Sequence, residues 1–161
     1  MATSKKPVLY ITLIAVLLLV IAGMAYKFIV AGSTVAGADG RAAIVLEPGE
    51  RALILGEMRG FLSGIQTMTD ALTREDMKTV AKTARSLGRA ASAEVPPALM
   101  GKLPLEFKKL GFSVHSDFDQ MAMDAESLGD AKHTLTQLSG TLQKCVACHA
   151  TFQLQAAAAG K

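Results

Sequence analysis

The first constraint on this chain is an apolar run near its N-terminus that is long enough to cross a membrane. Residues 8–30 are almost uninterruptedly apolar, and Lys27 is the only charged residue among them. The uncharged part, Pro7 to Tyr26, has about the 20 residues that a spanning helix requires. Lys5 and Lys6 precede it, and such residues tend to stay in the cytoplasm. We therefore expect residues 1–31 to form a single-pass anchor in a bacterial inner membrane, with the remainder in the periplasm.

A cleaved signal peptide is the alternative interpretation of the same run. Val-Ala-Gly sequences that a signal peptidase could accept occur at residues 30–32 and 35–37. The apolar core exceeds the roughly 7–15 residues of a secretory signal, so an uncleaved anchor is favoured. Either outcome exports the remainder. The small residues at 32–40 indicate that residues 32–46 are a flexible tether.

The only two cysteines of the chain lie in the sequence Cys145-Val146-Ala147-Cys148-His149. This C-x-x-C-H spacing is the attachment signal for c-type haem, because two thiols one helical turn apart can add to the two vinyl groups of one porphyrin. The imidazole of the next residue can then meet the iron. Export supports this interpretation, since bacteria attach c-type haem outside the cytoplasm. One covalently bound haem c is the predicted cofactor.

Three other interpretations of the two cysteines are weaker. Zinc requires four ligands, and only His115 and His133 remain to supplement the motif. A thioredoxin-like redox pair belongs beside a strand–helix–strand pattern, and no convincing strand is predicted. A structural disulfide between Cys145 and Cys148 is the simplest alternative.

Around the motif, residues recur at steps of four and three, which is typical of one face of a single helix. The predicted buried face consists of Ala131, Leu135, Leu138, Leu142, Cys145, His149 and Phe152. A thiol and an imidazole on this face could hold a haem edge-on inside a helical bundle.

Three helices are predicted upstream of the motif. Pro48 and Glu50 are suited to the first turn of a helix that runs to Leu72. Thr73–Asp76 resembles a capping box for a second helix, which ends at Glu94–Pro97. A third helix is expected at about Leu105–Leu128, after which Gly129 and Asp130 break the helix and cap the next one. The predicted buried faces are Arg51, Leu55, Met58, Leu62 and Ile65 in the first helix, and Phe107, Leu110, Val114, Phe118, Met121, Ala125 and Leu128 in the third. The predicted fold is all-α, an antiparallel four-helix bundle at residues 47–157 that follows the transmembrane helix.

Charge gives no indication of a nucleic-acid partner. The formal net charge is +3, but Lys5, Lys6 and Lys27 belong to the anchor. Without these three, the 17 basic residues fall to the same number as the 14 acidic ones, so the exported part is neutral. Nucleic-acid binding normally needs a basic face.

With these features the chain resembles the class II c-type cytochromes, the cytochrome c′ family. Members of that family are four-helix bundles with C-x-x-C-H near the C-terminus of the last helix, and the resemblance covers roughly Pro48 to Gln153. It implies that Cys145 and Cys148 bind the haem through thioethers, that His149 is the proximal iron ligand, and that Phe152 lies close to the haem. Family members often carry an Arg directly after this aromatic residue, where this chain has Gln153. They also commonly pair through their early helices, which implies a homodimer.

The resemblance leaves two alternatives for the sixth iron position. Arg51 and Leu55 match a basic residue and, four positions later, an apolar side chain that covers a five-coordinate iron, whose open site would admit NO or CO. Met58 matches the ligand of low-spin members, which favours electron transfer, although a Met on a helix stripe is also an ordinary core residue. Arg51 could pair with a haem propionate. His115 and His133 are less favoured as distal ligands, because histidines on long helices are more often at the surface.

One-electron transfer is the first functional hypothesis, without enzymatic activity. A membrane tether raises the effective concentration of a carrier near redox partner proteins at the membrane. Binding of a diatomic gas or protection against NO is the alternative. A third hypothesis is a haem-free periplasmic interaction bundle with a Cys145–Cys148 disulfide.

Overall fold

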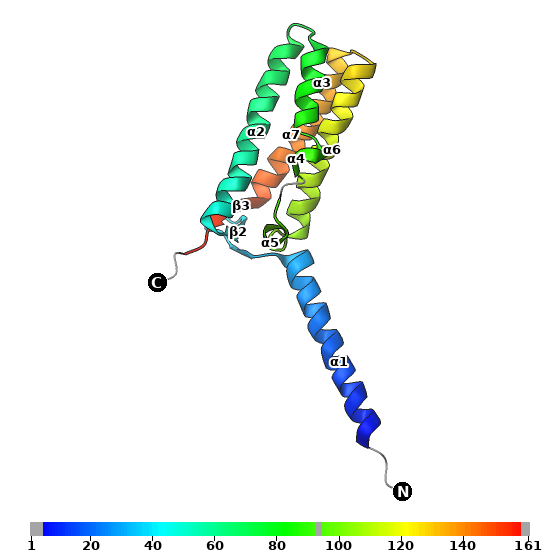
Figure 1. The fold of residues 1–161 in the computed structure, drawn as a ribbon. Coiled ribbons are helices and arrows are strands. Elements are labelled where there is room, and N and C mark those ends of the chain that lie inside the picture. The colour runs from blue at the N-terminus through cyan, green and yellow to red at the C-terminus, as the bar shows by residue number, and fades with distance from the viewer. Residues whose placement is uncertain (1–4, 93–94, 159–161) are drawn as a thin grey trace.

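The computed structural model describes residues 5–92 and 95–158 of the chain. It is mostly helical, with one long helix that projects from the rest of the molecule (Figure 1). This helix, α1 (Lys5–Ala25), continues into a π-helix, η1 (Tyr26–Ala31). Residues 7–31 are long and apolar enough to cross a membrane, and their large side chains are exposed. The predicted N-terminal apolar helix is therefore present.

The first helix after η1, α2 (Pro48–Leu72), has the predicted bounds. Pro48 occupies its first turn, where a missing N–H costs nothing. The carboxylate of Glu50 accepts a hydrogen bond from the Glu47 backbone N–H at 2.9 Å, which fixes the start of the helix.

The predicted second helix is shorter than expected. Thr73 lies at the end of α2, and Asp76 is the actual cap of α3 (Met77–Ser86), because its carboxylate accepts from the Thr79 N–H at 3.1 Å. The helical conformation is interrupted at Gly88. The Asp119 carboxylate occupies the space that a side chain at this position would need, and it accepts a hydrogen bond from the Arg89 N–H at 3.0 Å. Two short helices follow, α4 (Arg89–Ser92) and α5 (Pro97–Met100). Glu94, predicted near the end of the second helix, lies outside the described residues.

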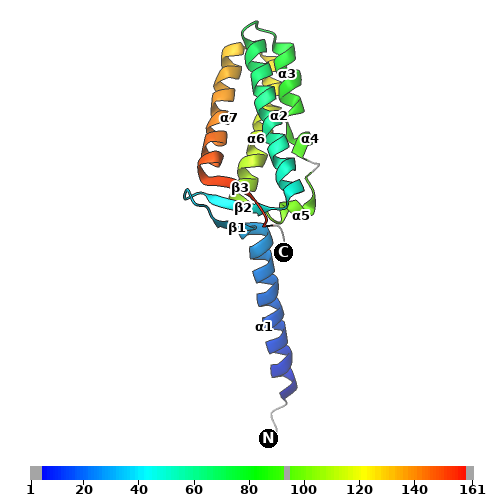
Figure 2. The same ribbon diagram turned by 90° about the vertical axis from the view of Figure 1, so that its left-hand side faces the viewer.

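The last two long helices are α6 (Leu105–Ser127) and α7 (Ala131–Thr151). As predicted, Gly129 and Asp130 separate them: Gly129 has φ +64°, and Asp130 accepts from the backbone N–H groups of Lys132 at 2.9 Å and His133 at 3.0 Å. Figures 1 and 2 show α2, α3, α6 and α7 running alongside one another.

The domain is mostly helical, as predicted, but it also contains a small three-stranded sheet, and two of its strands lie in the segment that was expected to be a flexible tether. Residues 34–36 and 42–46 form β1 (Thr34–Ala36) and β2 (Ala42–Leu46), and the residues after α7 form β3 (Phe152–Ala156) instead of extending the helix. Strand β2 pairs antiparallel with β1 and parallel with β3 (Figure 2). Ile44 and Leu46 are fully buried, so their apolar burial stabilises a strand whose partner lies about a hundred residues away along the chain.

The core lies between the four long helices and continues to the sheet. Its central cluster consists of Met68, Ala84, Val114, Phe118, Met121, Ala122 and Leu138. A second cluster beside the sheet consists of Ile44, Leu46, Ile54, Leu99 and Leu103. The predicted faces of α2 and α7 are rotated relative to the observed ones, since Leu62, Leu135 and Leu142 are exposed, and Leu128 is exposed beyond the end of α6.

The end of η1 contacts the domain directly. The backbone N–H of Ser33 donates to the carbonyl of Lys102 at 2.7 Å, and Lys108 Nζ donates to the carbonyl of Ile29 at 2.9 Å. Gly32 has φ +64° and is so close to the backbone of residues 102–104 that it has no space for a Cβ. The domain therefore sits on the end of η1 without slack chain between them.

Candidate functional site

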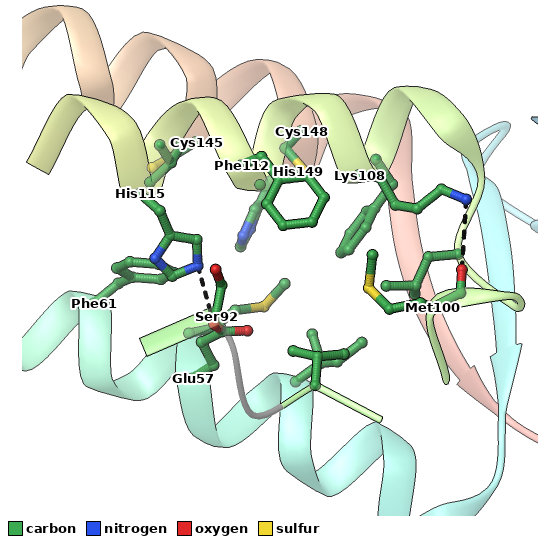
Figure 3. Close-up of a pocket in the computed structure, with 17 residues that line it drawn as sticks. Glu57, Phe61, Ser92, Met100, Lys108, Phe112, His115, Cys145, Cys148 and His149 are labelled. Carbon is green, nitrogen blue, oxygen red and sulfur yellow. Dashed lines mark hydrogen bonds and ion pairs between the residues drawn. The ribbon is translucent and has the colours of Figure 1, made fainter. Parts of the chain in front are cut away.

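The last turns of α7 present Cys145, Cys148 and His149 to one cavity (Figure 3). The cavity encloses about 800 Å³ of empty space, part of it open to solvent. Both cysteines are free thiols and are half-buried, whereas His149 lies at the exposed rim. The sequence motif therefore becomes a spatial cluster at the edge of a single cavity.

The observed core-facing stripe of α7 explains this orientation. It consists of Thr134, Leu138, Thr141, Cys145 and Cys148, again at steps of four and three. Leu135 and Leu142 of the predicted stripe are 48% and 38% exposed. The hydroxyl groups of Thr134 and Thr141 donate to the carbonyls of Asp130 and Gln137, so these polar residues can be buried without losing their hydrogen bonds. Both thiols thus belong to the inner face of α7.

The remaining walls of the cavity are largely apolar. They come from α2, α6 and the segment between α4 and α6, and include Ile54, Met58, Phe61, Met100, Leu103, Phe107, Phe112 and Val114. A largely apolar cavity with few polar groups is typical of small-molecule and cofactor sites. Two thiols at its edge and an imidazole at its rim are the donor set that a covalently bound haem needs.

A second cavity of about 520 Å³ adjoins the first, with Met58, Phe107, Cys148 and His149 lining both. Arg51 and Leu55 line only this second cavity. Phe152 also lines it, and the ring of Phe152 packs edge-on against Phe107 with the ring centroids 5.6 Å apart. Met58 is thus common to both cavities, whereas Arg51, Leu55 and Phe152 gather on the side toward the sheet.

His115 is buried, contrary to the prediction that it lies at the surface. It is 4% exposed, lines the first cavity and contacts the ring of Phe61 at a centroid distance of 5.0 Å. Its Nδ1 donates to the carbonyl of Leu87 at 2.7 Å, and its Nε2 lies 3.1 Å from a carboxylate oxygen of Glu57. The spacing of apolar residues in α6 predicted that Val114 and Phe118 are buried, but it gave no reason to expect the polar His115 beside them to be buried as well.

His133 lies apart from both cavities. Its Nε2 is 3.3 Å from the carboxylate of Asp124, and its side chain is largely exposed. Of the two histidines considered as distal ligands, only His115 lines the first cavity together with His149.

Arg41 is a site residue that the sequence did not indicate. It lines the second cavity, and its Nη1 donates to the backbone carbonyls of His149 at 3.1 Å and Phe152 at 3.3 Å. It comes from the segment that was expected to be a tether. Nothing in the local pattern around Arg41 points to the end of α7, because the contact is created by the pairing of β2 with β3.

The environment of the thiols limits their chemistry. Burial raises the pKa of Cys148, and burial together with the nearby carboxylate of Asp117 raises the pKa of Cys145. Both groups are therefore thiols at neutral pH. Thiol–disulfide exchange uses the thiolate, so this environment slows it.

Comparisons with known proteins neither name a family nor assign a function. No family model, curated protein or solved structure matches the chain. The functional argument therefore rests on the residues and the geometry described above.

Proposed function

We propose that this chain is a membrane-anchored c-type cytochrome of the cytochrome c′ class that transfers single electrons. In this proposal α2, α3, α6 and α7 are the antiparallel four-helix bundle, and the domain lies in the periplasm on an inner-membrane anchor. The observation that carries the proposal is the convergence of Cys145, Cys148 and His149 on one largely apolar cavity. The cysteines would hold a single haem c through thioether bonds, and His149 would be its proximal ligand.

The two adjoining cavities suit the two kinds of surface that a haem presents. The apolar walls of the first cavity are suited to the porphyrin ring, which is stabilised by removal from water. Arg51 lines the second cavity, and its guanidinium group would suit a propionate carboxylate. Arg51 Nε donates to the carbonyl of Leu154 at 3.2 Å, so its orientation is fixed by β3.

Met58 is the proposed sixth ligand, because it lines both cavities together with His149. A haem with two protein ligands supplies reversible one-electron chemistry and tends toward outer-sphere transfer. The contribution of the protein is to bury the ring, fix both axial side chains and exclude water. In this role the chain is an electron carrier for redox partner proteins at the membrane and not an enzyme.

Gas binding is the second candidate function. It is favoured by the placement of Leu55, which lines the second cavity beside His149 and could cover an open iron site. Such a site, in apolar surroundings, would accept neutral diatomic molecules and disfavour anions, which lose their hydration there.

The test is to express the full chain with haem-maturation machinery and to record optical and EPR spectra, with CO added to the reduced form. A covalently bound low-spin haem that ignores CO supports electron transfer, and a high-spin haem that binds CO supports gas binding. His149→Ala should abolish proximal ligation, whereas His133→Ala is the matched control because His133 lines neither cavity. If the wild-type chain carries no covalent haem, the proposal is wrong.

A further inference from the structure

The C-terminal end of α7 is held by a side chain from the other end of the domain sequence. Arg41 Nη1 donates to the carbonyl oxygen of His149, in the last turn of the helix, and to that of Phe152, the first residue of β3. Carbonyl groups in the last turn have no partner within the helix, and a cation is the favourable partner for them. Arg41 therefore caps the helix at the residue that would ligate the iron.

Arg41 is itself fixed by Asp39. Its Nε donates to Asp39 Oδ2 at 2.7 Å, and its Nη2 lies 2.6 Å from the same oxygen. The backbone N–H of Arg41 donates to Asp39 Oδ1 at 3.1 Å, which ties the carboxylate to its own turn. Gln153 Nε2 donates to that Oδ1 at 3.0 Å, so the carboxylate also holds the residue after Phe152. A guanidinium group that donates hydrogen bonds from several of its nitrogens has little freedom to move. It therefore fixes the positions of its partners in addition to supplying a charge.

The sheet keeps this cluster in register with α7. Ala42, the residue after Arg41, pairs with Phe152, and Ala43 pairs with Gln153. The turn before β2 is closed by the Gly37 N–H, which donates to the carbonyl of Arg41 at 2.8 Å. The pairing of β2 with β3 thus determines where α7 ends and how closely Arg41 approaches His149.

From this geometry we infer that Arg41 is a positioning residue for His149, with Asp39 and Gln153 holding Arg41 and the strand in place. This inference rests on the proposed haem. It assigns two effects to Arg41. Its hydrogen bonds restrict the last turn of α7 and so the direction of the imidazole. Its positive charge balances that of Asp39, so that loss of Arg41 would leave a net negative charge beside His149 and disfavour the reduced state of a bound haem. Net charge and hydrogen bonding around a haem are both determinants of its reduction potential.

Two substitutions separate these effects. Arg41→Ala removes charge and hydrogen bonds together, so the EPR spectrum should show more than one ligation state and the midpoint potential should fall. Arg41→Lys keeps the charge but cannot bridge two carbonyls and a carboxylate, so the potential should remain near that of the wild type while the ligation states stay mixed. Arg74→Ala is the matched control: it also removes an arginine paired with an aspartate, Asp70 at 2.7 Å, but outside both cavities.

The experiment uses the full chain in detergent micelles, loaded with haem, and compares covalent haem content, EPR spectra and midpoint potential. An Arg41→Ala protein with one ligation state and an unchanged potential overturns the inference without touching the proposed function. Hydrogen–deuterium exchange on the haem-free chain provides a second readout. Arg41→Ala should accelerate exchange at residues 149–152 by about tenfold or more, the expected effect of losing a charge-assisted hydrogen bond. Unchanged exchange there overturns the positioning role even if the chain never binds haem.

Discussion

The Nδ1 atom of His115 lies 2.7 Å from the carbonyl oxygen of Leu87, at the point where the chain leaves α3. The Nε2 atom faces the Glu57 carboxylate, so acceptors lie at both ring nitrogens. Only the protonated ring can donate to both of them. A single buried side chain therefore connects α2, α6 and the break between α3 and α4.

This arrangement predicts a pH-dependent stability. Burial alone would lower the pKa of His115, but the hydrogen bonds to Glu57 and Leu87 raise it above its ordinary value of 6.5. The stabilisation is therefore fully present below pH 6.5 and is lost as the pH rises through the raised pKa. The free energy of unfolding of the haem-free wild-type chain, measured by denaturant titration at a series of pH values from 6.5 upward, should decline as the pH rises. His115→Gln should flatten the profile. A slope that survives in His115→Gln would assign the effect to another group.

The proposed sixth ligand gives a spectroscopic prediction. Met58→Leu retains the apolar volume but removes the thioether, so the haem should change from low-spin to high-spin and bind CO when reduced. Met123→Leu is the control, because Met123 is exposed on α6 and lines neither cavity. A low-spin Met58→Leu protein would show that Met58 is not the sixth ligand.

Phe118 is predicted to be a major determinant of stability. It is fully buried, and its ring stacks on Phe61 at a centroid distance of 5.6 Å. Phe118→Ala should lower the free energy of unfolding by about 3–5 kcal/mol, through lost burial and the cavity left behind. Phe112→Ala should cost clearly less, because Phe112 is 42% exposed. Equal losses for the two variants, measured by denaturant titration, would contradict this account of the core.

The contact between η1 and the domain can be tested at Gly32. Gly32→Ala forces a Cβ to within 2.5 Å of the Lys102 carbonyl at a positive φ, so the junction must open and lose the Ser33–Lys102 hydrogen bond. Amide exchange at residues 33 and 45 should then increase, since Val45 N–H donates to the carbonyl of Ser33 at 2.8 Å. Gly49→Ala is the control, because a Cβ there meets nothing. Protection that persists in Gly32→Ala would mean that the junction tolerates a side chain.

The parts of the fold that local chemistry determines could be predicted from the sequence. Pro48 and Asp130 were identified as helix starts because a proline ring and a capping carboxylate act within one turn. The cysteine spacing placed Cys145, Cys148 and His149 together for the same reason. The rotation of α7 could not be predicted, because Thr134 and Thr141 are buried through hydrogen bonds to their own helix, which hydrophobic spacing does not register.

The parts that depend on distant contacts were missed. Residues 42–46 are apolar enough for a strand, but a strand of five residues needs a partner, and that partner is the segment that follows α7. Arg41 owes its position beside His149 to this pairing. His115 is buried because Leu87 and Glu57, from two other helices, satisfy both ring nitrogens. Each case depends on a long-range contact that no local window contains.

The direct seating of the domain on α1 also determines how the protein could meet other molecules. Ser33, two residues after the last residue of η1, is already hydrogen-bonded to Lys102. No flexible linker therefore lets the domain move independently of the helix. In a bilayer it would travel with its anchor at a constant height and orientation. Encounters would then be a two-dimensional search, in which a carrier collides only with molecules whose docking surfaces occupy the same thin layer above the lipid.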